Sequence, residues 1–550
     1  MNPGANGPND FDPPTRTPEV GNTQRPLERR SVQEADDHRP TVVVISSVGF
    51  VVRNYLLGGF LDSLRQRVRV FVCSPLHGEE TFQLMMRQRG AEVHSLENPK
   101  RNRAWRRCQM WRHDAHVAYM NNATWRMKHS ARHHDIGWRE RIINGGIHGV
   151  FRVISGPRLL GWMDRWETRR ALGSPTAAHY REWFEDIRPS LVFSPAPLMR
   201  DEWIPLQAAR AMGIRTALAV QSWDNLSSKA RLPLPCDALL VWSPAMREEA
   251  QRLYPEIPAE RIHIVGPPQF DYYYRPEYRM DRESFLKSLG GDPARPLVVY
   301  AGVTPGLMPE EHEIVAHLAR DIREGRVKGR PQLLVRLHPK DDGNRYRELK
   351  KAFPEMMLTI PGRDSGASIT HWHPDEEDIR SLVNTVRHAD VLINVASTMT
   401  IDAALMDRPV VNIRYHFRPP EARPPWGVFI YDTAHYAPLM TTGGFRMAHS
   451  PSELVDHVNR YLDDPSLDRD GRRRLAGRVC GTLDGRAGER SAETLLRLLP
   501  RPRPIGPEEP PLVIPEVGIH HEGDVRKAAL QGVGRLQKPK RTRGKGAGRR

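Results

Sequence analysis

At 550 residues the chain is too long for one hydrophobic core, so we expect two domains flanked by polar ends. A formal net charge of +16 leaves nucleic acid, anionic lipid and phosphorylated substrates as partner classes. The four cysteines form no Cys-x-x-Cys pair, no run of about 18 apolar residues occurs, and the N-terminal stretch lacks the apolar core of a secretory signal. These features argue against a zinc site, a disulfide framework and a membrane span, and they predict a cytoplasmic protein.

Both ends of the chain are predicted to be disordered. Residues 1–39 are rich in Pro, Asn, Asp and Arg, and the stretch 501–550 is first Pro-rich and then basic, ending in QKPKRTRGKGAGRR. One interpretation of this last stretch is a solvated tail, and the other is a tether to nucleic acid or anionic lipid.

The first half of the remaining chain alternates apolar runs with helical patterns. TVVVISSV at 41–48 indicates a buried strand, YLLGGFLDSLRQR has helical periodicity, and VRVFVCSP at 68–75 indicates a second strand. This rhythm predicts a parallel sheet with helices on both faces. We expect it to build an N-terminal Rossmann-like domain over 40–274, with further strands at 189–197, 214–222, 236–244 and 261–268.

One stretch within this domain breaks the rhythm, and we expect it to form a helical insertion over 100–172. From Lys100 to Arg170 there are sixteen Lys or Arg against five Asp or Glu, with six Trp among them. Trp at headgroup level and Arg on lipid phosphate are typical of an interfacial helix. The segment therefore predicts contact with an anionic membrane surface or a lipid-linked acceptor. The alternatives are an ordinary insertion with a solvated basic face and, more weakly, a nucleic-acid surface.

A second series of strands follows a polar break near 275–295. It predicts a C-terminal Rossmann-like domain over 275–480, with a last helix over 481–500. The expected class is therefore α/β, with two doubly wound domains facing a cleft. Ligands in such sheets bind at the carboxyl ends of the strands, so the site is expected there. The strands of this domain are expected at 296–304, 331–340, 356–362, 389–397 and 408–415.

Two loops of the second domain carry residues suited to phosphate. Ser397 and Thr398, in ADVLINVASTMTIDAAL, fall where a strand ends and a helix begins. They either cap the free N–H groups of that helix or share them with a phosphate. His338 and Lys340 follow the strand LLVRL, where they supply a donor and a point charge for phosphate or form a simple surface turn.

Glycine-containing loops follow the first strand of each domain. In VVYAGVTPG, Gly302 lets the backbone approach a ligand, and Thr304 stands two residues further on. In ISSVGFVV, Ser47 and Gly49 take the same place on the acceptor side. Neither loop has G-x-G-x-x-G or P-loop spacing, so neither predicts a dinucleotide site.

The paired Rossmann-like domains, the HPK loop and the pattern AST-x-T-x-D-AAL-x-x-x-PVV together resemble the GT-B superfamily of glycosyltransferases. The likeness is nearest to the bacterial capsule and teichoic-acid branch, with its CDP-glycerol glycerophosphotransferases, and covers about 40–480. It implies that Asp402 stands where many members have a Glu that grips the ribose. The Glu-x7-Glu pair of retaining members is absent from this helix, which implies inversion. The resemblance also implies that the donor diphosphate is held by His338, Lys340, Ser397 and Thr398. It likewise implies that 40–274 is the acceptor domain and 275–480 the nucleotide-donor domain.

QSWDNLSSK, at 221–229, follows a strand of the first domain and carries more polar groups than a plain turn needs. Asp224 is the candidate base that takes the proton of an acceptor hydroxyl. Trp223 would stack on a sugar, Asn225 would hydrogen-bond it, and Lys229 would neutralise a phosphate. The alternative is that Asp224 and Asn225 cap a turn by side-chain bonds, with Trp223 packed beneath them.

No metal or other cofactor is expected, because the cations of the HPK loop and a helix N-terminus can neutralise a leaving diphosphate. His371 and His373 have metal-pair spacing without an evident third ligand, so they are expected to contact the nucleotide base or to precede a helix. Asp201 and Glu202 are predicted to open a helix, and GPPQFDYYY at 266–274 is predicted to be the hinge between the domains.

Together these features predict a GT-B glycosyltransferase that moves a sugar from a nucleotide-sugar donor to a surface-polysaccharide or lipid-linked acceptor. It would work peripherally at the inner face of the membrane. The alternatives are a CDP-glycerol-type polyol-phosphate transferase, a sugar-nucleotide 2-epimerase, and a non-catalytic GT-B-like binding protein. An epimerase has no use for the insertion rich in Trp and Arg, and a non-catalytic protein predicts no effect of substitutions at the site.

Overall fold

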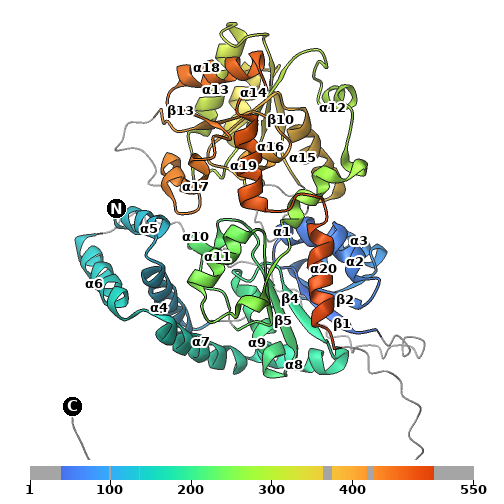
Figure 1. Cartoon of the computed structure of the whole chain (residues 1–550), viewed down its shortest axis with the longest axis vertical. Helices are drawn as coiled ribbons and strands as arrows, with labels where there is room; N and C mark the ends of the chain where they lie inside the picture. Colours follow the sequence, from blue (N-terminus) through green and yellow to red (C-terminus); the bar gives the residue numbers. More distant parts are fainter. Residues whose placement is uncertain are drawn as a thin grey trace, which may run out of the picture. The chain divides into compact units, whose positions relative to one another are not determined.

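The structure, a computed structural model, describes residues 39–97, 101–134, 137–233, 235–362, 374–417 and 427–500. Both predicted disordered ends, and with them the basic tail, lie outside these ranges, apart from residue 39. His371 and His373 lie outside them as well. Within the described ranges the chain forms two parallel sheets with helices packed around them (Figure 1). The predicted α/β class with two doubly wound sheets is confirmed.

The first sheet has seven strands in the order β3-β2-β1-β4-β5-β6-β7, and every neighbouring pair is parallel. β1 is TVVVI and is buried along its whole length, as expected for a strand covered on both faces. The order reverses between β1 and β4, which makes their carboxyl ends the switch point of this sheet. The bounds are β1 (Thr41–Ile45), β2 (Arg69–Ser74), β3 (Ala91–Ser95), β4 (Leu191–Ser194), β5 (Arg215–Ala219), β6 (Ala238–Val241) and β7 (Ile262–Ile264).

The second sheet repeats this arrangement with six parallel strands in the order β10-β9-β8-β11-β12-β13. Its switch point lies between β8 and β11. β3 and β13 are the two strands that the apolar pattern did not predict, and both are short edge strands with partly exposed residues. The bounds are β8 (Leu297–Ala301), β9 (Gln332–Arg336), β10 (Met357–Thr359), β11 (Val391–Asn394), β12 (Val410–Ile413) and β13 (Arg446–Ala448).

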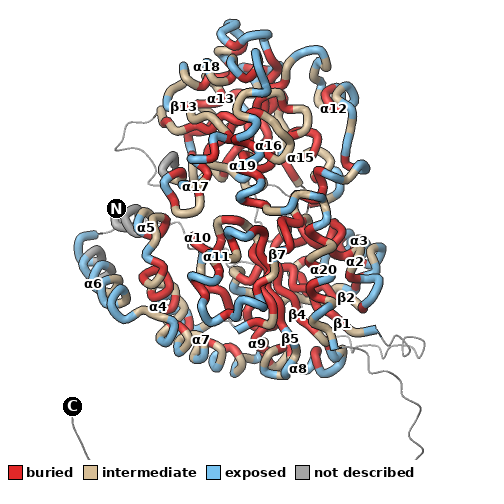
Figure 2. The backbone as a smooth tube through the Cα atoms, in the orientation of Figure 1, coloured by how far each residue is buried: buried red, intermediate tan, exposed pale blue. Residues whose placement is uncertain are grey.

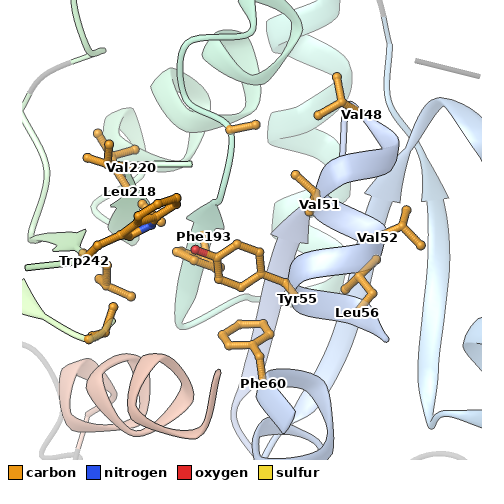
Figure 3. Packing of buried hydrophobic residues seen from close by; sticks show 14 of the residues in the cluster. Val48, Val51, Val52, Tyr55, Leu56, Phe60, Phe193, Leu218, Val220 and Trp242 are labelled. Atoms are coloured by element: carbon orange, nitrogen blue, oxygen red, sulfur yellow. The ribbon is translucent and has the colours of Figure 1, made fainter. Parts of the chain in front are cut away.

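Helices cover both sheets, and aromatic side chains fill the core of the first. Tyr55, Phe60 and Phe193 meet edge-on or tilted, with ring centroids 5.2–5.5 Å apart (Figure 3). Tyr55 lies in a single π turn, Val52–Leu56, that continues α1. The helices of the first half are α1 (Gly49–Val51), α2 (Gly59–Leu64), α3 (Glu80–Gln88), α8 (Pro175–Ile187), α9 (Trp203–Ala211), α10 (Asn225–Ser228) and α11 (Pro244–Leu253).

The insertion rich in Trp and Arg is helical, as predicted, but its tryptophans divide between two environments. Trp105 and Trp125 are buried, whereas Trp111, Trp138 and Trp162 are exposed. Along the backbone, the helix over 138–154 is mostly exposed, whereas the helix over 103–120 is partly buried (Figure 2). α4 begins where the side chain of Asn102 accepts a hydrogen bond from an amide of its first turn. None of the described helices of the protein is both long and apolar enough to span a bilayer. The insertion comprises α4 (Arg103–Met120), α5 (Ala123–His134), α6 (Trp138–Ile154) and α7 (Pro157–Leu172).

After the second sheet the chain returns to the first. Its last helix, α20 (Ala487–Leu498), packs against α2. The Asp271 carboxylate accepts hydrogen bonds from the amides of Ala487 and Gly488 at 3.0 and 2.7 Å. Gly488 is needed there, because a Cβ would lie 2.8 Å from the Phe60 nitrogen. The remaining helices are α12 (Arg282–Ser288), α13 (Glu311–Arg323), α14 (Arg347–Ala352), α15 (Glu376–His388), α16 (Met399–Leu405), α17 (Ala437–Met440), α18 (Pro451–Asp463) and α19 (Arg469–Cys480).

Candidate functional site

The buried carboxylate of Glu311 anchors the loop that follows β8. The amide of Val303 donates to the Glu311 carboxylate at 3.0 Å, and the Tyr346 hydroxyl donates to it at 3.2 Å. Arg345 pairs with the same carboxylate at 2.7 Å. Burial raises the pKa of Glu311 to about 7, although Arg345 opposes the shift. Gly302 and Thr304, both predicted to bind the donor, lie in the loop that this carboxylate fixes.

The HPK loop after β9 is joined to the same network. Arg345 also donates to Asp341 at 2.7 Å, and the Asp341 amide donates to the carbonyl of His338 at 2.8 Å. The Nδ1 of His338 accepts the Lys340 amide at 3.0 Å, so the proton of the neutral ring is on Nε2. Burial, with Lys340 and Arg345, lowers the pKa of His338 to about 4. At neutral pH His338 therefore keeps one N–H to donate, which suits the predicted contact with phosphate.

The loop after β11 has a strained backbone. Ala396 has a φ of 45°, in the left-handed region that favours glycine. The Ser397 amide donates to Asn394 at 2.9 Å, and the Ser397 hydroxyl accepts the Met399 amide at 3.3 Å. Thr398 begins α16, is exposed, and makes no side-chain cap to that helix. Of the two predicted phosphate-binding hydroxyls, Ser397 is therefore partly used as a cap and Thr398 is at the surface.

Asp402 is placed differently from the expected grip on a ribose. Its side chain is buried, and it accepts a hydrogen bond from the Tyr273 hydroxyl at 2.6 Å. Tyr273 belongs to the connection between the sheets that was predicted as a hinge. Burial raises the pKa of Asp402 to about 6, while Tyr273 and Arg53 oppose the shift. The structure thus shows Asp402 joining its helix to the connection between the two sheets.

Glu202 lies at the switch point of the first sheet. It immediately precedes α9, in agreement with the prediction that Asp201 and Glu202 open a helix. Its carboxylate accepts the hydroxyl of Ser47 at 2.5 Å and also the hydroxyl of Ser194. The amides of Ser47 and Ala196 donate to it as well, each at 3.3 Å. Ser47 and Glu202 are 1% and 0% exposed, and Gly49 is buried in the first turn of α1. The structure therefore does not present the predicted acceptor-side residues Ser47 and Gly49 to a ligand.

The QSWDNLSSK segment folds around Asp224. The carboxylate accepts hydrogen bonds from the Ser228 hydroxyl at 2.8 Å and from the side-chain amide of Asn225 at 3.2 Å, and Trp223 is buried. Asn225 also accepts the backbone amide of Ser222 at 3.2 Å, as the capped-turn alternative predicted, but Asp224 makes no side-chain cap to the helix that follows it. Burial would raise the pKa of Asp224, but Lys229, His435 and the bonds from Ser222 and Ser228 hold it well below its usual range. The Asp224 carboxylate is therefore a stable anion, and the residue is partly exposed to solvent.

Residues from the second half of the chain reach this segment. The rings of Trp223 and His435 meet edge-on, 5.0 Å apart, and Tyr436 lies 5.5 Å from Trp223. Burial, with Lys128 and Lys229, lowers the pKa of His435 to about 4 against the opposing effect of Asp224. His435 could not be identified from the sequence, because it follows a 3-10 turn rather than a strand of either sheet.

The helical insertion also contacts the Asp224 segment and the loop that carries His435. Asn122 donates to the carbonyl of Ser227 at 2.8 Å, and the ammonium of Lys128 donates to that of Ser228 at 2.6 Å. Thr124 accepts the amide of Ala434 at 2.9 Å. α5 thus contacts both the Asp224 segment and the loop of His435. Among the described residues no group of three or more His, Cys, Asp or Glu is arranged to hold a metal ion.

No protein-family model matches the sequence, and no curated protein matches it. Among solved structures, the chain is similar to UDP-GlcNAc 2-epimerase from Neisseria meningitidis bound to UDP-GlcNAc (11% identity, 83% of this chain and 99% of that chain, TM-score 0.47). A glycosyltransferase from Rickettsia africae matches at 9% identity over 84% and 98%, with a TM-score of 0.46. The UDP-GlcNAc 2-epimerase from Methanocaldococcus jannaschii matches at 10% over 83% and 99%, with a TM-score of 0.46. At these TM-scores the likeness carries no argument about the site, and the fold rests on the strand order described above.

Proposed function

We propose that the protein is a nucleotide-sugar-dependent glycosyltransferase that acts where the two sheets contribute to one polar cluster. The observation that carries this proposal is the contact of Trp223, which follows a strand of the first sheet, with His435 of the second half. Asp224 and Lys229 belong to the same segment as Trp223. The Lys229 charge lowers the pKa of Lys340, so the HPK loop lies within electrostatic range of this segment. Such a cluster suits a ligand shared by two doubly wound domains.

On the donor side, cations stabilise the leaving group. A diphosphate between the HPK loop and Lys229 would meet the ammonium groups of Lys340 and Lys229 and the Nε2–H of His338. Burial and Lys229 lower the pKa of Lys340, and a bound anion would relieve that repulsion. Glu311 contributes indirectly, by fixing the loops that carry Gly302 and His338.

On the acceptor side, Asp224 acts as the base. An acceptor hydroxyl loses its proton to the Asp224 carboxylate while its oxygen forms a bond to the anomeric carbon of the donor. The bond from that carbon to the diphosphate breaks, and its electron pair leaves with the nucleoside diphosphate. The depressed pKa of Asp224 keeps the carboxylate ionised throughout the neutral range, so it is available as an acceptor, while the same shift weakens it as a base.

The outer surface of the insertion supports an acceptor at a membrane. On α6, Trp138 (67% exposed), Ile142 (65%), Val150 (59%) and Val153 (85%) fall on one helical stripe. On α7 the exposed stripe reads Arg158, Trp162, Arg165 and Arg169. An apolar stripe on one helix and a row of arginines on the next are complementary to the acyl boundary and phosphates of an anionic bilayer.

The catalytic proposal is tested by NMR on the full chain incubated with UDP-, CDP-, GDP- and dTDP-sugars. We expect one nucleotide to bind, and binding to weaken about tenfold or more in His338→Ala/Lys340→Ala. The control is Lys287→Ala, which removes an exposed lysine of α12 paired with Glu283. Asp224→Asn should retain binding and lose about 100-fold in release of nucleoside diphosphate.

Two results would overturn this proposal. Formation of the C2 epimer of the donor, without release of nucleoside diphosphate, would establish an epimerase. Absence of binding by any nucleotide would favour a non-catalytic protein. Release of a nucleoside monophosphate would instead show that the transferred group is a polyol phosphate.

The membrane contact is tested separately, by sedimentation with vesicles of phosphatidylglycerol and of phosphatidylcholine. We expect binding to the anionic vesicles alone, and a loss of fivefold or more in Val153→Glu. Leu84→Glu is the matched control, because Leu84 is an exposed apolar residue of α3, outside the insertion. Equal binding by both variants would place the membrane contact elsewhere.

A further inference from the structure

The helical insertion brings a lysine to the Asp224 segment that the proposed donor contacts and base do not include. Lys128 lies on α5, and its ammonium donates to the carbonyl of Ser228 at 2.6 Å. The same ammonium lies over the ring of Trp125, 4.4 Å from its centroid. The hydroxyl of Ser228 in turn donates to the Asp224 carboxylate at 2.8 Å. A single residue therefore joins Lys128 to the group that is proposed to take the proton of the acceptor.

Positive charge from three parts of the chain gathers around this segment. Lys128 comes from the insertion, Lys229 from the segment after β5, and Lys340 from the loop after β9. Besides burial, the charges of Lys128 and Lys229 lower the pKa of His435. Burial and Lys229 likewise lower the pKa of Lys340. Lys229 is exposed and Lys128 is half-buried, so an anion that relieves this repulsion would bind at the surface and needs no enclosed cavity.

Lys128 is placed for the acceptor rather than for the donor. In the proposed reaction the donor diphosphate lies between the HPK loop and Lys229. Lys128 belongs to α5, which contacts the Asp224 segment and the loop of His435. The molecule that approaches the Asp224 carboxylate in that reaction is the acceptor. A cation next to this carboxylate therefore suits a negative charge on the acceptor itself.

We propose that the acceptor carries a phosphate group and that Lys128 binds this phosphate close to the reacting hydroxyl. An ammonium group is a compact point charge that suits phosphate oxygens. The insertion that carries Lys128 also carries the exposed apolar stripe of α6, so this placement favours the phosphate of a lipid over that of a soluble phosphoester. Identifying the ligand as an acceptor rests on the proposed transferase function, whereas the binding of phosphate by Lys128 does not.

Binding is tested without any nucleotide, by isothermal titration calorimetry on the full chain. The probes are geranyl phosphate, geraniol (the same lipid without the charge) and glycerol 3-phosphate (the phosphate without the lipid). We expect geranyl phosphate to bind about tenfold more tightly than geraniol, and to weaken about tenfold in Lys128→Gln. Glutamine keeps an N–H donor for the Ser228 carbonyl and removes the charge. Arg126→Gln is the matched control, because Arg126 is an exposed cation on another side of the same helix.

Lys128→Arg is the second variant. It keeps the charge and should keep the binding, which separates the loss of charge from a misfolded α5. Tighter binding of glycerol 3-phosphate, lost in Lys128→Gln, would support the phosphate site and assign its ligand to a soluble phosphoester. Equal affinities for geranyl phosphate and geraniol, or equal losses in Lys128→Gln and Arg126→Gln, would overturn the proposal. Absence of saturable binding by the wild type would overturn it too.

The donor site is checked with the same probe. Binding of geranyl phosphate that survives Lys128→Gln and is lost in His338→Ala/Lys340→Ala would place the probe in the donor site and overturn the proposal. A protein that binds a nucleotide-sugar but none of the phosphate probes would remain a candidate transferase and lose only this inference. Conversely, binding of geranyl phosphate that depends on Lys128, without binding of any nucleotide, would leave the phosphate site and overturn the catalytic proposal.

Discussion

The two sheets have the same strand order, yet their switch points are closed in different ways. In the first sheet Glu202 joins the loops after β1 and β4, on both sides of the switch point, and its partners are neutral hydroxyls and amides. In the second sheet Glu311 joins the loops after β8 and β9, on one side only, and its main partner is Arg345. The buried Glu202 thus fills the switch point of the first sheet, whereas the buried Glu311 supports the loops on one side of the second switch point.

This difference fits the two roles proposed for the two halves of the chain. Glu202 takes up hydroxyl and amide donors at the first switch point, and the polar cluster of the first half lies after β5, around Asp224. In the described part of the second sheet no such bridge joins the loops after β8 and β11, and the strained Ala396 lies in the latter loop. The predictions below alter one of these features at a time, beginning with the largest effect.

Removing the acid of the second sheet should cost the most. Glu311→Ala leaves Arg345 without its fully buried partner, and breaking a buried pair costs about 3–5 kcal/mol. Urea denaturation followed by fluorescence measures this loss. Glu313→Ala, two residues further along α13, is the control and should change stability by less than about 1 kcal/mol. A similar small loss for Glu311→Ala would mean that Arg345 is held adequately by Asp341 alone.

The pH dependence of stability should reveal the acid of the first sheet. Burial raises the pKa of Glu202 from its ordinary value of 4.5 to about 7. The folded protein therefore binds the extra proton, and the stability it provides is present below pH 4.5 and lost as the pH rises to about 7. A shift of this size corresponds to about 3 kcal/mol, since one pKa unit is about 1.4 kcal/mol.

Glu202→Gln removes this titration and should flatten the decline between pH 4.5 and 7 by about that amount. Thermal unfolding at several pH values measures it. A curve that runs parallel to that of the wild type would show that Glu202 titrates normally in the folded protein.

Two adjacent serines offer a finer comparison. Ser47→Ala removes a hydroxyl bonded to the Glu202 carboxylate and should cost about 2 kcal/mol, in the range for bonds to charged groups. Ser46→Ala removes a hydroxyl that is equally buried and has no partner among the described residues, so it should be close to neutral. Comparing the denaturant midpoints of the two variants measures the difference between their stability losses. Equal losses would remove the special role assigned to Ser47.

The smallest effect is expected at the switch point of the second sheet. Ala396→Gly should stabilise the protein by about 1 kcal/mol, because glycine adopts a positive φ without the clash of a Cβ. Differential scanning calorimetry is sensitive enough to detect the change. A lower melting temperature would show that the loop gains more from the methyl group of Ala396 than it loses in strain.

The strands that could be predicted are those whose apolar residues are contiguous. β1 is the clearest case, and the ten others marked by apolar runs follow the same rule. β3, with the sequence AEVHS, and β13, with RMA, lie at sheet edges and bury only part of their residues, so their pattern resembles a loop. Composition also identified the insertion, but it does not tell which side of a helix packs, and the buried Trp105 could not be separated from the exposed Trp138.

The site was harder to predict because its decisive contacts are distant in sequence. Ser47 and Glu202 lie 155 residues apart, and no local pattern joins them. His435 contacts Trp223 from the other half of the chain, without a strand before it to mark its place. Conversely, Asp224, Lys229, His338 and Lys340 could be nominated because each follows a strand of a doubly wound sheet. What these residues bind stays a prediction until nucleotides and sugars are tested.

The return of α20 to the first sheet has a consequence for how the protein is made. The strands of that sheet are complete at residue 264, but the helix that covers α2 is synthesised only after the whole second half. At about 5–20 residues per second, the surface around Phe60 waits roughly 10 to 45 s for α20 to emerge. During this time an apolar patch of the nascent chain is open to chaperones and to other chains. A premature stop just before α20 would therefore harm the N-terminal half, although it leaves all of its strands intact.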